Sequence, residues 1–335
     1  MPHAALRAQV VDDSAGIPLP LANVFIANST IGASTDTDGT CRLVNVPLGT
    51  HQVVASLMGY VPNTEVVQFA DTVEYEAHFR LRPRMIPLPG VVVEEREPKE
   101  WKLNLQRFLD AFFGTTSNAT QCVILNPQVL DFATEPATGR FSASARGPLF
   151  IDNKALGFRC QFFLDHFTQV RETSGYFSIQ FVGVARFAPL RPQDEDELTV
   201  WKFNRERAFM GSKRHFLSAL IQRNTKKQGF EVNRIHKNWI EYALQRRTGF
   251  SVDADTLIAP GPSTFQWTFA FPELLQVVYT QGRQRYYSVI ELNRPSVLVY
   301  SNGLLDDPLR ILTYGFWAYQ RFANMLPIDY QPDEP

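Results

Sequence analysis

The sequence predicts an N-terminal all-β sandwich over residues 1–83 and a C-terminal mixed α+β domain over residues 101–335. In the first region, short stretches alternate apolar and polar side chains, and turn residues recur every ~8 to 12 positions. From Trp101 onward, apolar residues recur first at helical spacing. The length of 335 residues, with 44% hydrophobic and 20% charged residues, fits about two globular domains.

Strands are expected in the first region wherever an alternating stretch ends at Gly, Pro, Asn or Asp. The expected strands cover residues 6–12, 22–28, 41–46, 51–57 and 73–81. Asp38 and Gly39 predict a hairpin turn, because Gly favours positive φ and Asp tolerates it. Asp36 and Asp38 also have the spacing of a calcium loop. Pro47, however, stands where that loop needs a bidentate acid, so we expect no calcium site.

The turns and strands of this region follow one another in the order of a known family. The segments that carry the similarity are Asp12–Val24, Gly32, Thr35–Gly39, Val46–Gly49 and Ser56–Tyr60. Together they resemble the carboxypeptidase-like regulatory domain. The resemblance implies a transthyretin-like, carbohydrate-binding-like β-sandwich, common in periplasmic and outer-membrane proteins of Gram-negative bacteria. Ala8 and Cys41 replace the Gly and Phe usual in the family, and neither disrupts a turn.

Residues 84–100 are expected to form an interdomain linker. They combine three prolines with a cluster of Glu, Arg and Lys, a composition typical of exposed connecting segments. One short strand is expected inside the linker, at Gly90–Val93.

The second region is expected to mix helices with strands. A helix is predicted from Trp101 to Phe113, ended by Gly114, and a long helix from Leu198 to Gln228, closed by Gly229. Strands are expected within 141–188 and at 265–271, 275–281, 286–292 and 296–300, before a final helix at 316–325. Segments such as Cys122–Pro127 and Gly211–Phe216 resemble the uncharacterised C-terminal half of carboxypeptidase-like regulatory domain-containing proteins. That resemblance implies an architecture and no assigned activity.

Charge is distributed unevenly along the chain. Residues 1–83 hold four basic and eight acidic residues, whereas residues 202–247 hold twelve basic and three acidic ones. Clustered cations attract phosphates, although a solvated helix face has the same composition. The anion-binding candidates in this segment are Arg205, Arg207, Arg214 and His215.

A seven-residue pattern, WKxNxxR, occurs twice, at Trp101–Arg107 and Trp201–Arg207. Trp, Asn and Arg at this spacing lie along one side of a helix. Two interpretations remain open: the two helices share a ligand, or each begins with a packed Trp and a paired Arg. We favour the second, because nothing else in the chain repeats.

Catalytic and metal-binding motifs are absent from the sequence. None of the six histidines is followed by Glu three positions later, as the zinc carboxypeptidases require, and HExxH, GxSxG, GxGxxG and the P-loop are also missing. The three cysteines are far apart and lack ligand spacing. We therefore assign no catalytic residue, no metal and no cofactor.

These observations favour a non-enzymatic binding or interaction protein of the cell envelope that lacks the peptidase domain. Its suspected partner is an envelope protein or a glycan. The alternative is an enzyme with an unrecognised site in residues 101–335, acting on an anionic envelope substrate through Arg205, Arg214 and His215. A third hypothesis is nucleic-acid binding by the basic segment, for which no sequence-specific recognition pattern is present.

The predicted location is the periplasm or the outer membrane, as the resemblance implies, with the cytoplasm as the alternative. No stretch approaches the ~18 to 20 apolar residues needed to span a bilayer. The residues after Met1 lack the apolar core of a signal peptide, and the first expected strand already begins at Leu6. An exported protein would therefore need a signal upstream of Met1.

The expected linker leads to the first prediction. Limited proteolysis should cut within residues 84–100, because proline and charge there predict an exposed segment crossed by few contacts. Mass spectrometry of the digest should then identify a stable fragment ending near residue 90. If digestion yields no such fragment, the domain boundary is misplaced.

Overall fold

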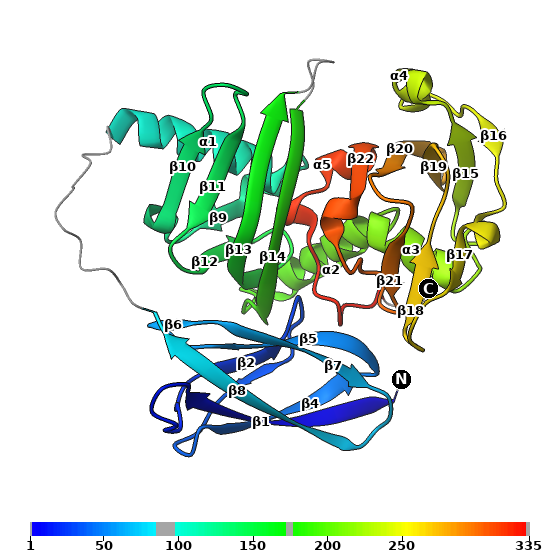
Figure 1. Ribbon diagram of the computed structural model, residues 1–335. Helices are drawn as coiled ribbons and strands as arrows, with labels where there is room; N and C mark the ends of the chain where they lie inside the picture. The colour runs from blue at the N-terminus through cyan, green and yellow to red at the C-terminus, as the bar shows by residue number, and fades with distance from the viewer. Residues whose placement is uncertain (1, 85–97, 172–176, 333–335) are drawn as a thin grey trace.

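The computed structural model describes residues 2–84, 98–171 and 177–332. The N-terminal part is a β-sandwich of two four-stranded sheets (Figure 1). One sheet has the order β4-β1-β8-β6: Thr40–Pro47, His3–Asp12, Glu74–Pro83 and Tyr60–Val61. The other has the order β3-β2-β5-β7: Gly32–Ser34, Asn23–Ile26, Gly49–Ser56 and Asn63–Phe69. The predicted all-β sandwich is confirmed.

Alternation along the strands builds the core of the sandwich. The inward positions of β1 are Leu6, Ala8 and Val10, all completely buried, and Val24 and Ile26 face them from β2. The residues between them point outward, as the period of two requires. Gly39 has a φ of +68°, and a Cβ there would lie 2.6 Å from the carbonyl oxygen of Val10, so the Asp38-Gly39 turn accepts only glycine.

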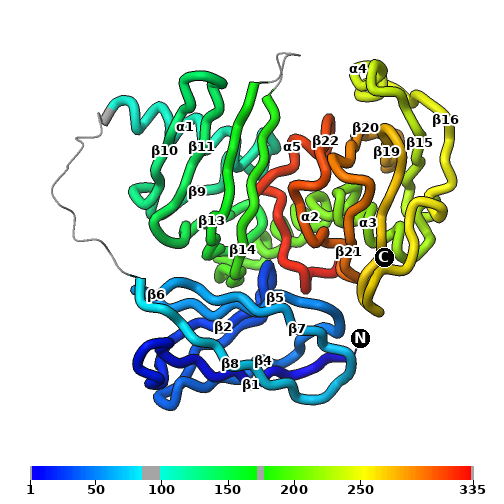
Figure 2. Tube along the Cα trace, viewed as in Figure 1, coloured from blue at the N-terminus to red at the C-terminus, as the bar shows by residue number. Residues whose placement is uncertain are grey.

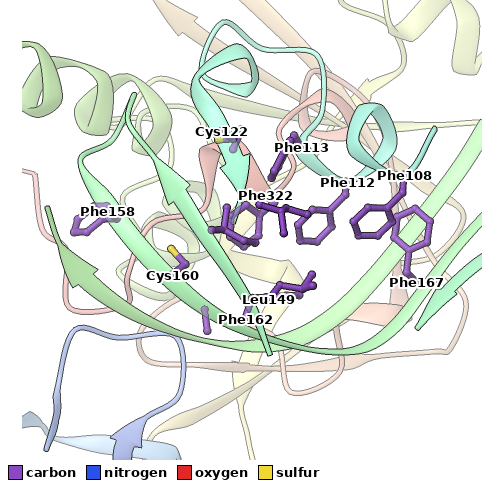
Figure 3. Close-up of a cluster of buried hydrophobic side chains, with 14 of the residues drawn as sticks. Phe108, Phe112, Phe113, Cys122, Leu149, Phe158, Cys160, Phe162, Phe167 and Phe322 are labelled. Carbon is purple, nitrogen blue, oxygen red and sulfur yellow. The ribbon is translucent and has the colours of Figure 1, made fainter. Parts of the chain in front are cut away.

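The second region begins with a helix packed on a six-stranded sheet. Helix α1 spans Pro98–Phe113 and ends at Gly114, which has a φ of +90°. The sheet has the order β10-β11-β13-β12-β9, with β14 paired to β13: Leu130–Thr134, Phe141–Ala145, Phe158–Arg171, Leu149–Asn153, Cys122–Ile124 and Phe177–Pro189. Phenylalanines fill the space between helix and sheet, and the ring of Phe112 contacts those of Phe108, Phe162 and Phe322 (Figure 3).

Helix α2 (Glu195–Phe209) ends in the first core, and helix α3 (Lys213–Ile221) contributes to a second core. Its main sheet has the order β16-β15-β19-β20-β22: Phe250–Ser251, Phe230–Ile235, Leu274–Gln281, Gln284–Leu292 and Ile311–Gly315. A smaller sheet has the order β17-β18-β21: Ile258–Pro260, Gln266–Phe269 and Val297–Tyr300. Two short helices complete this part: α4 (Ile240–Ala243) and α5 (Phe316–Tyr319). The predicted mixture of helices and strands in the second region is confirmed.

Two predicted helices differ from the observed ones. The long helix expected from Leu198 is interrupted at Gly211, where φ is +76° and a Cβ would strike the ring of Tyr279 at 2.3 Å. Ser212 then caps α3 by accepting a hydrogen bond from the backbone N–H of His215. The expected C-terminal helix stops at Tyr319, because Gln320 is extended and forms a β-bridge with Gly114.

Sequence reasoning also overlooked several strands of the second region, among them β15 and β22, and placed the start of α1 three residues late. The strand expected at Gly90–Val93 lies outside the described residues, as does most of the expected linker.

The sandwich packs against the second region through one outer sheet face. Phe25 and Val54 point away from the sandwich core and pack against Phe163 and Val184 of the β13-β14 hairpin. The Phe25 and Phe163 rings stack with their centroids 6.0 Å apart. This contact buries the outer side of the β3-β2-β5-β7 sheet where β2 and β5 meet.

A turn of the sandwich, residues 28–31, enters the second region between β14 and the C-terminal segment (Figures 1 and 2). Asn28 exchanges backbone and side-chain hydrogen bonds with Ala185 of β14, at 2.7 and 3.0 Å. On the other side, the carboxylate of Asp329 accepts bonds from the N–H of Thr30, at 2.9 Å, and from its hydroxyl. Ile328 donates its N–H to the carbonyl of Asn28, and its side chain joins the sandwich core.

Arg214 holds this C-terminal segment in place from α3. Its guanidinium donates to the carbonyl oxygens of Pro327 (2.7 Å), Ile328 (2.5 Å) and Tyr330 (3.0 Å). Burial lowers the pKa of Arg214 to about 10, while the nearby carboxylate of Asp329 opposes that shift. We call residues 326–330, bound by Arg214 and Thr30, the C-terminal strap.

The strap leads to the second prediction. Arg214→Met should lower the free energy of unfolding by about 3 kcal/mol, because it leaves several carbonyls without their charged donor. Chemical denaturation measures the change. Arg207→Met is the matched control, since Arg207 is exposed on α2, and its effect should stay within about 0.5 kcal/mol. Equal effects of the two variants would show that the strap bonds add nothing to stability.

Candidate functional site

The free surface of the sandwich is the outer face of the β4-β1-β8-β6 sheet. Strands β1 and β8 run parallel and in register, which pairs Arg7 with Glu76 and Gln9 with His78. Arg42 and Thr40 of β4 continue these two rows. Within each row, side chains project from neighbouring strands that lie about 4.8 Å apart. The face is therefore a grid of hydrogen-bonding groups. We call this surface the polar face; its members are Arg7, Gln9, Thr40, Arg42, Glu76, His78, Arg80 and Arg82.

Two shallow hollows mark the polar face. One, of about 150 Å³, is lined by Arg7, Gln9, Thr40, Glu76 and His78. The other, of about 370 Å³, lies toward β6 and is lined by Asp13, Val61, Pro62, Asn63, Arg80 and Arg82. Both hollows present donors and acceptors together, the combination that a ligand rich in hydroxyl groups requires.

Ion pairs border the polar face. Arg42 Nε lies 2.5 Å from Glu74 Oε1, and Arg82 Nε lies 3.2 Å from Asp13 Oδ2. Both pairs are exposed and so add little to stability. Their effect is to balance charge at the two ends of the face, which leaves Glu76 and His78 near its middle.

Asp12, next to Asp13 of the second hollow, links the end of β1 to β6. Its carboxylate accepts hydrogen bonds from the hydroxyl of Ser14, the N–H of Ala15 and the hydroxyl of Tyr60, at 2.5, 2.9 and 2.9 Å. These bonds, that of Ser14 first, lower the pKa of Asp12 to about 2. The ionised carboxylate thus fixes the β1 turn to β6.

The predicted anion-binding residues mostly face the interior of the protein. Arg205 donates to the carbonyl of Leu156 at 2.7 Å and lies 4.2 Å over the ring of Phe158. Arg214 binds the strap. Arg207 is exposed and lies over the ring of Phe203, at 5.6 Å. The structure therefore leaves Arg207 as the one member of this set on an open surface.

His215 is only 5% exposed and is bonded on both nitrogens. Its Nδ1 accepts the N–H of Gly211 at 3.0 Å, so Nε2 carries the proton that bonds Gln228 Oε1 at 3.1 Å. Burial lowers the pKa of His215, which favours this neutral form. Arg214 and His215 turn inward, because the break at Gly211 directs α3 into the core. Anion binding by the set remains a prediction.

Three cations of the basic segment form ion pairs with carboxylates. Arg223 lies 3.9 Å from Asp255, Lys237 lies 3.0 Å from Glu291, and Arg247 Nε lies 3.1 Å from Glu231. The excess of positive charge in the sequence is therefore partly balanced in the folded protein.

The repeated WKxNxxR pattern lies on two packed helices, near the start of α1 and in the second half of α2. Trp101 donates its indole N–H to Leu130 at 3.2 Å, and Trp201 donates to Lys154 at 2.7 Å, both carbonyls at strand or turn ends. Arg107 donates to Gln169 Oε1 and lies over the ring of Phe141, whereas Arg207 lies over the ring of Phe203. These contacts favour the packing interpretation.

The cysteines behave as apolar side chains. Cys41, Cys122 and Cys160 are all free thiols, and burial raises the pKa of Cys122 to about 12. Among residues 2–84, 98–171 and 177–332, no three or more His, Cys, Asp or Glu side chains gather as a metal-binding group. Nor does any helix in the described part of the chain have the length and apolarity to cross a membrane.

Comparison with known proteins identifies the first part of the chain. The fold defines it as a β-sandwich domain with one sheet face free. Residues 6–93 match the family CarboxypepD_reg-like domain, so the chain contains a carboxypeptidase-like regulatory domain. The resemblance to this family that the sequence analysis identified is confirmed. No curated protein matches the sequence.

Several solved structures show distant similarity. The Bacillus anthracis TIE protein is 16% identical over 24% of this chain and 17% of its own, with a TM-score of 0.22. A proposed carbohydrate binding protein from Bacteroides uniformis is 8% identical over 90% of this chain and 100% of its own, with a TM-score of 0.21. A proposed membrane-associated protein of unknown function from Bacteroides fragilis is 11% identical over 89% and 97%, with a TM-score of 0.19. At these scores we draw no functional argument from them.

The third prediction concerns Asp12. Because its pKa in the folded protein is about 2, against 3.8 for the ordinary carboxyl, its bonds stabilise the fold above about pH 4. That contribution is lost as the pH falls from about 4 to about 2. Asp12→Asn should therefore lower the Tm at neutral pH and converge with the parent protein toward pH 2. A Tm difference that is constant with pH would contradict this assignment.

Proposed function

We propose that this protein is a non-enzymatic binding protein of the cell envelope whose sandwich binds a glycan on its polar face. The observation that carries the proposal is that the outer face of one sheet is packed against the second region, whereas the outer face of the other sheet is open. Packing of Phe25 against Phe163 occupies the outer side of one sheet, whereas the polar face carries both hollows. A partner of the sandwich therefore meets the polar face.

The chemistry of the polar face supports a hydroxyl-rich ligand. Gln9 and His78 form a row next to that of Arg7 and Glu76, and each row contains both donors and acceptors. Sugar hydroxyls both donate and accept hydrogen bonds, and each therefore finds a partner on such a grid. The hollows are shallow, which suits a chain of sugars lying along the sheet.

The alternative, an enzyme acting through Arg205, Arg214 and His215, has less support. Arg205 and Arg214 donate hydrogen bonds to backbone carbonyls. Both ring nitrogens of His215 are hydrogen-bonded within the protein. A proton transfer at His215 would first require the bond to Gln228 or Gly211 to break.

Placement in the envelope rests on the family resemblance. Periplasmic or outer-membrane location is tested by fractionating cells that express the gene from its own locus, with its upstream sequence intact. Recovery in the cytoplasmic fraction alone would replace the envelope proposal with the cytoplasmic alternative.

The fourth prediction tests the glycan site. Calorimetric titration with soluble peptidoglycan fragments and with neutral polysaccharides should detect binding of one of these classes. The double variant Glu76→Ala with His78→Ala should weaken it by about tenfold or more, because each of the two rows loses one hydrogen-bonding side chain. Gln68→Ala, an exposed residue on β7 of the other sheet, is the matched control and should bind normally. Unchanged binding by the double variant would exclude the polar face.

A further inference from the structure

Three exposed aromatic side chains lie at one end of the β16-β15-β19-β20-β22 sheet. Trp239 and Tyr242 follow the end of β15, in the 3-10 turn Lys237–Trp239 and in α4. Phe250 of β16 pairs with Arg234, next to the last residue of β15. Their exposed fractions are 43%, 57% and 71%. We call these three residues the aromatic tip; α4 lies at the opposite end of the molecule from the sandwich (Figures 1 and 2).

A buried amide network fixes the backbone that carries the aromatic tip. Gln276 has no exposed surface. Its Nε2 donates to the carbonyls of Ala243 and Arg246, at 2.5 and 2.7 Å, and its Oε1 accepts the N–H of Thr248 at 2.9 Å. Asn233 donates to the same oxygen. The loop between α4 and β16 is thus held to the sheet.

The inner side of α4 is already packed. Ala243 is completely buried in a small cluster with Ile235, Leu274 and Val289, and Ile240 packs against the same cluster. The apolar contacts of α4 with the sheet are therefore made without Trp239 and Tyr242. Their exposure is a stable property of the fold.

Basic side chains surround the aromatic tip. The segment from Arg234 to Phe250 contains four basic residues and one acidic residue, Glu241. Lys237 and Arg247 pair with glutamates of the sheet. Arg246 instead lies 5.2 Å over the ring of Tyr242, and within the described residues neither it nor Arg234 forms an ion pair with a carboxylate.

We propose that the aromatic tip attaches the protein peripherally to an anionic lipid surface. Trp and Tyr are the side chains that settle at the level of lipid headgroups. The cations Arg234 and Arg246 attract anionic headgroups, and each basic residue near such a surface adds to binding. Charge alone would also attract nucleic acid or an acidic polysaccharide. Phe250 favours a lipid surface over these two polyanions, because its wholly apolar side chain gains from contact with acyl chains.

Sedimentation with lipid vesicles tests this inference with the full chain. Binding should be strong to vesicles of phosphatidylcholine containing a quarter phosphatidylglycerol and weak to phosphatidylcholine alone. The triple variant Trp239→Ala, Tyr242→Ala, Phe250→Ala should lose about tenfold or more in vesicle affinity, because three aromatic contacts with the interface are removed. Phe203→Ala, a similarly exposed aromatic beside Arg207 on α2, should bind like the parent protein.

Two further measurements separate the contribution of the cations from that of the aromatic side chains. Arg234→Gln with Arg246→Gln should remove the preference for anionic vesicles. Adding vesicles should shift tryptophan fluorescence to the blue in the parent protein but not in Trp239→Phe. Unchanged Tm values confirm that the variants fold.

Three outcomes would each overturn the proposal: equal vesicle binding by the parent protein and the triple variant, an equal loss of affinity in Phe203→Ala, or binding to polygalacturonate without binding to vesicles. Glu76→Ala with His78→Ala should leave vesicle binding intact, so this test and that of glycan binding fail independently.

Discussion

The arrangement of this protein depends on one guanidinium group. Arg214 gathers three carbonyls of the C-terminal strap, and the strap in turn presents Asp329 to Thr30 and Ile328 to the sandwich core. A charged donor that serves several carbonyls is worth more than a neutral one, and its partial burial strengthens each bond. The contact between Phe25 and Phe163 supplies apolar area, but the strap decides which way the sandwich faces.

Orientation of the sandwich has a direct bearing on recognition. A β-sandwich has two outer faces, and this chain uses one of them internally. The polar face is therefore held pointing away from the second region, while the aromatic tip occupies the far end of the molecule (Figure 1). Two surfaces with different chemistry thus stand at opposite ends of a connected body.

The sandwich was predictable because its signals are local. The turn at Asp38-Gly39 and the alternation of Leu6, Ala8 and Val10 are readable within a few residues. The structure of the second region depends on contacts between residues that are distant in the sequence. Gly211 ends a helix because Tyr279 lies against it, and the charge of Lys237 is paired with that of Glu291. The polar face could have been suspected from the outward residues of β1 and β8, but only the pairing of those strands shows which side chains become neighbours. Nothing local indicated that Arg214 and His215 would turn inward.

The bond between Thr30 and Asp329 joins residues 299 positions apart. During synthesis the strands of the sandwich emerge long before the strap, since N-terminal domains fold first and such distant contacts form last. Phe25 and Val54 stay exposed on the nascent chain until the β13-β14 hairpin has left the ribosome, and Thr30 gains its partner only when Asp329 has followed. Docking of the sandwich therefore proceeds in two steps: the β13-β14 hairpin covers the apolar face first, and the strap closes over residues 28–30 only when the last residues of the chain have been made.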